Sequence, residues 1–135
     1  MRYLTEHEYA LASRFLFLSM AITVIQKDIT SIETGNGVKI KEPYLELLKM
    51  MEDRALTERQ QLRKYMYEEK VSVEPLEKND TFTAYLFISK QKEEKRHYFN
   101  PAIRKKVEQI LTELMMIGYE DTYQRQKEKE MGYGG

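Results

Sequence analysis

The chain has 135 residues, 22 basic and 22 acidic residues that cancel to a formal net charge of zero, and no cysteine. The length fits one domain that can bury its own core. We expect this domain over residues 1–130, followed by a flexible tail over residues 131–135. The absence of cysteine excludes a disulfide framework, a thiolate metal site and a cysteine nucleophile, and it fits a cytoplasmic protein. The balanced charge argues against overall attraction to nucleic acid or to an anionic membrane.

The first predicted element is a long, densely apolar helix over Glu6–Ile32. Thr5 and Glu8 have the spacing of a capping box, which marks its start. Apolar residues recur every three or four positions, and a helix that is apolar nearly all round is buried on most sides. The stretch Tyr9–Ile25 reaches the short limit of a membrane span, but it contains Arg14, so we favour a buried helix and expect no membrane contact.

Arg14 lies within this apolar stretch, and no acidic residue stands four positions away on either side. An unpaired charge in the interior is very costly. We therefore predict an ion pair with Glu113 or with a glutamate of the second helix such as Glu58, with snorkelling to the surface as the alternative. The apolar girth of the first helix also exceeds what one amphipathic neighbour covers, which predicts a homodimer through this helix.

A second helix is predicted over Pro43–Glu69. The segment Thr34–Gly37 ends the first helix, because glycine and asparagine accept positive φ at little cost. Pro43 suits the first turn of a helix, where its missing amide proton is no loss. Opposite charges four residues apart on the exposed face make this helix amphipathic. The short connection makes the two helices antiparallel neighbours.

Beyond the second helix the residues favour β-structure. We predict a hairpin of Val71–Leu76 with Phe82–Ile88, because β-branched and aromatic residues dominate both runs. Pro75 marks the first strand as an edge strand. A short helix over Phe82–Lys92 is the alternative.

The remaining chain predicts a charged turn and a third helix. The turn covers Lys90–Lys95, and Arg96–Phe99 form either a third strand or an irregular lead-in. Asn100 as N-cap and proline after it predict a helix over Pro101–Gly118, which either ends there or continues through Tyr119–Glu130. The predicted fold class is mainly α (α+β): a helical bundle of three main helices with a small β-hairpin.

Motifs for catalysis or metal binding are weak. Glu94 precedes His97 by three residues, the spacing of a carboxylate–histidine pair in di-iron bundles. Those bundles need the motif twice, and the sequence holds it once, so we interpret both residues as solvated or locally bonded. The glycines of Thr34–Gly37 lack the strand and the lysine of a phosphate-binding loop. We therefore predict no metal, no cofactor and no enzymatic activity.

The most uneven charge distribution lies in a basic segment. Residues 89–106 hold seven basic and two acidic residues, a net charge of +5, whereas residues 107–135 have a net charge of −3. Cations near a helix N-terminus oppose the helix dipole, and a bound anion would remove the conflict. The candidate anion or nucleic-acid surface consists of Lys92, Lys95, Arg96, His97, Tyr98, Arg104, Lys105 and Lys106. A solvated face paired within the chain is the favoured interpretation, ahead of a surface for a protein partner and of nucleic-acid binding with aromatic stacking.

Three short strings carry a resemblance to a known family: Lys27-Asp28-Ile29, Lys41-Glu42-Pro43-Tyr44 and Tyr98-Phe99-Asn100. With the apolar first helix, they make the chain similar to an uncharacterised family of small helical proteins from spore-forming bacilli. The resemblance implies a bacterial cytoplasmic protein and assigns no activity, ligand or catalytic residue. We expect a non-enzymatic protein-interaction or regulatory domain that self-associates. A nucleic-acid-binding regulator that uses residues 90–106 is the alternative.

Overall fold

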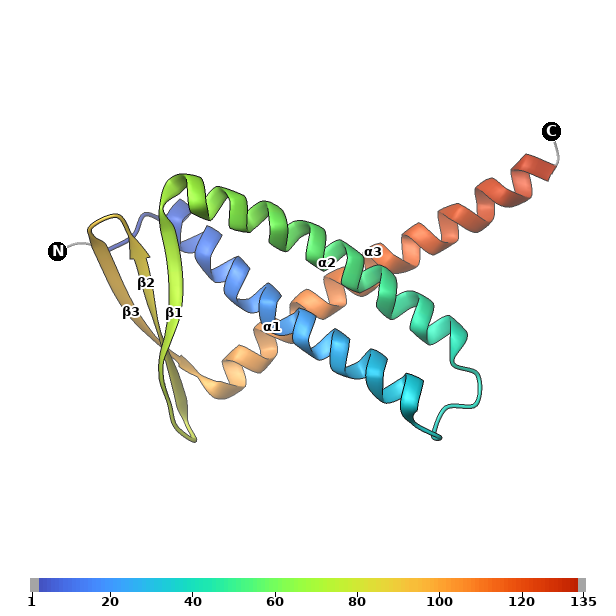
Figure 1. Ribbon diagram of the computed structural model, residues 1–135, viewed down its shortest axis with the longest axis horizontal. Helices are drawn as coiled ribbons and strands as arrows, with labels where there is room; N and C mark the ends of the chain where they lie inside the picture. The colour runs from blue at the N-terminus through green and yellow to red at the C-terminus, as the bar shows by residue number, and fades with distance from the viewer. Residues whose placement is uncertain (1–2, 134–135) are drawn as a thin grey trace.

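A computed structural model describes residues 3–133 of the chain (Figure 1). Helices predominate and accompany one antiparallel sheet, so the α+β class predicted from the sequence is confirmed. In chain order the elements are α1 (Glu6–Thr34), α2 (Glu42–Glu69), β1 (Val71–Lys78), β2 (Phe82–Ser89), β3 (Lys92–Phe99) and α3 (Asn100–Tyr133).

Local signals in the sequence set both ends of α1. The Thr5 hydroxyl accepts a hydrogen bond from the Glu8 amide at 3.1 Å, and the Thr5 amide donates to Glu8 Oε1 at 2.8 Å, so the predicted capping box is confirmed. The helix ends at Thr34, two residues later than predicted. The Gly35 amide caps it by donating to the Ser31 carbonyl oxygen. A Cβ on Gly35 would lie 2.6 Å from that oxygen, so this close approach requires glycine.

Helix α1 forms the centre of the core. It packs against α2 in an antiparallel pair, and α3 crosses the pair (Figure 1). Every large apolar side chain of α1 between Tyr9 and Ile32 is at least partly buried, and Leu18 and Ile25 are fully buried. By length and composition α1 would also pass as a membrane span, but the core helix of a soluble protein passes the same test. The chain itself thus buries, at least in part, the large apolar side chains of the helix through which we predicted a homodimer, and that contact stays a prediction.

The sheet lies beside the end of the helical pair where α1 begins and α2 ends (Figure 1). Its strand order is β1-β2-β3, and both pairings are antiparallel. The predicted hairpin is confirmed, and β1, which contains Pro75, is an edge strand. The alternative helix over Phe82–Lys92 is wrong. The predicted charged turn over Lys90–Lys95 is too long, because the third strand begins at Lys92 and only Lys90 and Gln91 form the turn.

Helix α3 starts directly after β3 and continues through Tyr133. The alternative in which the helix continues past Gly118 through Tyr119–Glu130 is therefore correct. Val107, Ile110 and Leu114 bury its first half against α1 and α2. After Leu114, every described side chain of α3 is exposed, and the helix extends past the helical pair (Figure 1). Of the predicted flexible tail, residues 131–133 belong to α3, and residues 134–135 lie outside the described residues.

Candidate functional site

The structure divides the predicted basic segment between two faces of the sheet. Successive side chains of a strand point to opposite sides. Lys92 and Arg96 therefore face α1, where Lys92 Nζ lies 2.9 Å from Glu8 Oε1 and the Arg96 guanidinium lies 4.0 Å from the centre of the Tyr9 ring. Lys95 points to the opposite face, and its Nζ lies 3.0 Å from Glu77 Oε1.

The basic residues of α3 diverge as well. Lys106 faces α1, with Nζ 5.5 Å from the centre of the Phe17 ring. Arg104 lines a hollow with Asp80 and Asn100, whereas Lys105 lies beside Glu108. Consecutive helical residues are rotated by about 100°, so these three cations cannot share one face. The eight residues of the candidate anion surface thus do not form one surface, and pairing within the chain accounts for four of them: Lys92, Lys95, Arg96 and Lys106.

Glu94 and His97 lie on opposite faces of β3, because they are three positions apart on a strand. Glu94 is buried and accepts hydrogen bonds from Arg96 Nε and, at 3.2 Å, from the Leu4 amide. His97 is exposed. Among residues 3–133 no group of three or more histidine, aspartate or glutamate residues has the arrangement of a metal site. The three-residue spacing of Glu94 and His97 therefore lies on a strand, where it does not bring the two side chains to one face as it would on a helix.

A buried polar cluster joins the start of α1 to the sheet. The Glu8 side chain is buried, with 6% of the residue exposed. Its carboxylate accepts hydrogen bonds from the Ser89 hydroxyl, the Thr5 backbone amide and the Lys92 ammonium group. The hydrogen bond from Ser89, followed by those from Thr5 and Lys92, lowers the pKa of Glu8 from 4.5 to about 2. Glu8 is therefore ionised at neutral pH and holds the helix start against the sheet rather than serving as a proton donor.

A second buried cluster lies deeper along the same junction. The hydroxyls of Tyr9 and Tyr98 share a short hydrogen bond, and Tyr98 also contacts Phe17 edge to face, with ring centres 5.3 Å apart. Burial, and secondly the hydrogen bond to Tyr9, raises the pKa of Tyr98 above its usual value of 10. Tyr98 is thus a neutral core residue, and it is not available for stacking on a nucleic-acid base.

Arg14 joins the three helices through the partners predicted for it. Its Nε and Nη2 atoms lie 2.6 and 3.0 Å from the two carboxylate oxygens of Glu58 on α2, and Nη1 lies 3.1 Å from Glu113 on α3. The Glu58 contact is bidentate, which fixes the orientation of the guanidinium as well as its charge. The ion pair predicted for Arg14 is confirmed with both carboxylates.

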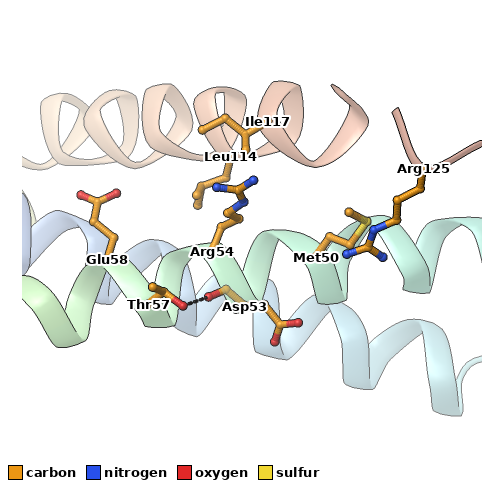
Figure 2. A pocket seen from close by; sticks show the side chains of 8 residues that line it. All are labelled: Met50, Asp53, Arg54, Thr57, Glu58, Leu114, Ile117 and Arg125. Carbon is orange, nitrogen blue, oxygen red and sulfur yellow. Dashed lines mark hydrogen bonds between the residues drawn. The ribbon is translucent and has the colours of Figure 1, made fainter. Parts of the chain in front are cut away.

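A cleft of about 510 Å³ lies between α2 and α3, beside this ion pair (Figure 2). Its apolar lining comes from Met50 of α2 and from Leu114 and Ile117 of α3, and Figure 2 shows Arg125 pointing from α3 toward Met50. The remaining lining residues are polar side chains of α2: Asp53, Arg54, Thr57 and Glu58. The cleft combines apolar side chains with charges of both signs, so it differs from the predominantly apolar cavities that bind small molecules.

Exposed apolar side chains continue from the cleft along α3. Met115, Met116 and Ile117 are 47%, 55% and 39% exposed, but they follow one another on α3 and therefore point in directions about 100° apart. Ile117 lines the cleft, whereas Met115 lines a neighbouring hollow with Tyr44 and Leu47. We call the cleft, with the exposed side chain of Ile117 in its lining, the α2–α3 site. The sequence analysis missed this site because Ile117 also fits the buried stripe of the last helix. The run of four apolar residues Leu114–Ile117 is the one signal in the sequence, since a stripe facing a single side needs at most two in a row.

The sequence profile of the YhjD protein family matches residues 3–119, so the chain belongs to this family, and the resemblance to a family from bacilli is confirmed. A relative described as an uncharacterized protein YhjD, from Bacillus subtilis (strain 168), is 37% identical over 109 residues, which are 81% of this chain and 90% of the relative. No solved structure matches the chain.

Proposed function

We propose that this protein is a non-enzymatic interaction domain that assembles with other protein chains through the α2–α3 site. The observation that carries the proposal is a cleft of mixed charge whose apolar lining includes the 39% exposed side chain of Ile117. Met50 belongs to the same lining, and methionine is flexible and polarisable, so it adapts to the shape of a partner surface.

The extended half of α3 supports the same proposal. Isolated helices shorter than about 12–15 residues are marginal in water, and most helical stability in proteins comes from packing of one face. The described side chains after Leu114 are exposed, and residues 124–130 are all polar. A partner bound at the α2–α3 site would contact the start of this segment and stabilise it as a helix.

The buried ionisable groups support a role without catalysis. The titratable residues buried within the described chain are Glu8, Glu94, Tyr85 and Tyr98. Each contacts a second element: Glu8, Glu94 and Tyr98 through hydrogen bonds, and Tyr85 through its ring contact with Tyr98. Catalytic groups are typically kept accessible to a substrate in a cleft, with a pKa near the working pH. A cytoplasmic location and the absence of a membrane contact stay predictions, as does nucleic-acid binding by residues 90–106.

Site-specific photocrosslinking in the native cell tests this function. A photoreactive amino acid at Ile117 should give discrete covalent protein adducts, because this side chain lines the α2–α3 site and is 39% exposed. The same amino acid at Lys64, an exposed position on α2, should give none. Equal labelling at both positions, or no adduct at Ile117, would contradict the proposal.

A further inference from the structure

We propose that a second copy of this chain docks face to face on the outer side of the sheet. The outer side is the one that α1 does not cover, and Figure 1 shows the helices on the other side. Tyr85 and Phe87 of β2 point into the core, so the alternate residues Phe82, Ala84, Leu86 and Ile88 face outward. This surface is separate from the α2–α3 site, so the proposal adds a second contact, with a named partner, to the interaction function proposed above.

The outer face has an apolar centre. Four successive outward residues of the central strand are apolar, and Phe82 contacts Phe99 of β3 with ring centres 5.7 Å apart. Phe82 and Phe99 are 43% and 50% exposed and Leu86 and Ile88 are half-buried, whereas Ala84 is only 1% exposed and adds no contact area. A sheet with one solvated face is expected to carry polar residues there, so an apolar centre indicates a covered face.

In two of the outward rows the edge strands carry opposite charges. In the register of the sheet, Glu74 of β1 and Lys95 of β3 flank Leu86. In the next outward row, Glu77 and His97 flank Ala84. The row at Ile88 differs, because Ser72 and Glu93 flank it and it contributes no pair of opposite charges.

This pattern is complementary to itself under one symmetry. A two-fold axis parallel to β2 lays β1 of one copy over β3 of the other, so Glu74 of each copy faces Lys95 of the other copy. A two-fold axis across the strands would instead lay β1 over β1 and bring Glu74 against Glu74. A two-fold interface is formed by the same patch on both chains, so the charges favour the first arrangement. Lys95 already pairs with Glu77 within the chain, and in the dimer it would exchange this partner for Glu74 of the other copy.

The edges of the sheet disfavour the competing mode, in which strands of two copies pair edge to edge. Pro75 lacks an amide proton, and the register of β1 shifts between Pro75 and Glu77. Both features blunt an edge strand. The first five residues of the other edge strand, β3, are all charged, from Lys92 to Arg96. These charges also disfavour pairing with another strand.

The size of the face sets the expected strength. Eight residues per strand at about 3.3 Å each and three strands at about 4.8 Å give a face of about 26 by 14 Å. A pair of such faces covers about 700 Å² in total, below the roughly 1,200 Å² at which specific, stable interfaces begin and in the range of weak, transient contacts. We therefore expect a weak dimer, with a dissociation constant on the order of 100 μM, that weakens further as salt screens the edge charges.

Sedimentation equilibrium of the full chain over a range of concentrations tests the proposal. The wild-type chain should dimerise, and Leu86→Lys should raise the dissociation constant at least tenfold by placing a charge in the apolar centre. Tyr67→Lys is the matched control, because Tyr67 is 86% exposed on α2, away from the sheet face, and its replacement should leave the constant unchanged. Circular dichroism establishes that each variant is folded.

Charge reversal separates the sheet face from any effect on folding. Glu74→Lys and Lys95→Glu should each weaken the homodimer, because each places like charges opposite one another in both copies. An equimolar mixture of the two variants should form a heterodimer about as strong as the wild-type dimer, since every 74–95 contact is then between opposite charges. Contacts within one chain cannot produce this recovery.

The outcomes distinguish this proposal from the interaction function. A wild-type chain that stays monomeric at the highest soluble concentration overturns the sheet-face dimer, and adducts at Ile117 would still support the α2–α3 site. A dimer that persists in Leu86→Lys and in both single charge variants also overturns the proposed sheet-face contact. The chain would then self-associate through another surface. A mixture that shows no recovery overturns the proposed two-fold arrangement.

Discussion

At the scale of single residues, Arg14 is the clearest case of a side chain whose environment dictates its partners. It lies in an apolar helix and is still about one third exposed, so its charge needs a partner but is not fully cut off from water. The two carboxylates differ in exposure, at 36% for Glu58 and 56% for Glu113. A more exposed partner contributes less, because water screens the attraction.

We expect Arg14→Ala to lower the free energy of unfolding by about 1 kcal/mol, and Arg14→Lys to lower it by less, because lysine keeps the charge and loses the bidentate contact. Double-mutant cycles in urea should give a larger coupling for Arg14 with Glu58 than for Arg14 with Glu113. The structure would be wrong at this site if the order of the two couplings were reversed.

The partners of Arg14 were predictable from the sequence, whereas those of Glu8 were not. A cation in an apolar helix needs a carboxylate partner, and few glutamates of the neighbouring helices are placed to supply one. Glu8 already had a complete local role in the capping box. Its contacts with Ser89 and Lys92 span more than 80 residues, and no spacing in the sequence indicates them.

At the scale of elements, the junction of α2 and β1 depends on one left-handed residue. Lys70 has φ 57° and ψ 45°, and its amide donates to the carbonyl oxygens of Met66 and Tyr67. A residue with a Cβ is disfavoured in this conformation, and glycine is the usual residue at the end of a helix. The chain thus turns from helix to strand without a connecting loop.

We expect Lys70→Gly to raise the free energy of unfolding by about 0.5–1 kcal/mol, because it removes the Cβ penalty. Lys64→Gly is the matched control in the exposed interior of α2, and it should lower the free energy of unfolding by about 1 kcal/mol. Thermal or urea unfolding measures both. A loss of stability in Lys70→Gly would contradict this account of the junction.

The predicted element boundaries agree with the structure where local residues determine them. They differ where pairing between strands determines them. The capping box, Pro43 and Asn100-Pro101 placed helix starts to within one residue. The strand Lys92–Phe99 opens with five charged residues that have low strand propensity, so its pairing with β2 overrides local preference. The same alternation explains why the basic segment is not one surface, since neighbouring cations on a strand face opposite sides.

At the scale of the whole molecule, the pH dependence of stability should report the junction at the start of α1. The pKa of Glu8 is about 2 in the folded chain against 4.5 for an unperturbed carboxyl. A depressed pKa stabilises the folded state above pH 4.5, and this stabilisation is lost as the pH falls from 4.5 toward about 2.

We expect Glu8→Gln to lower the free energy of unfolding by about 2 kcal/mol at neutral pH, since it removes a buried charge-assisted cluster. The difference between wild type and variant should shrink as the solution is acidified through this range. Urea unfolding over a pH series measures it. A difference that stays constant with pH would show that Glu8 acts through packing rather than through its charge.

The junction at the start of α1 also determines the order in which this chain can fold during synthesis. Helices α1 and α2 are adjacent in sequence and can pair as soon as both have emerged from the ribosome. The contact of the Leu4 amide with Glu94, and those of Tyr9 and Phe17 with Tyr98, can form only after residues at least 80 positions later have been synthesised. Contacts so distant along the chain form late and slowly. The apolar start of α1 therefore remains uncovered on the nascent chain until the third strand has been made, and this interval is when the protein is most exposed to aggregation and most in need of a chaperone.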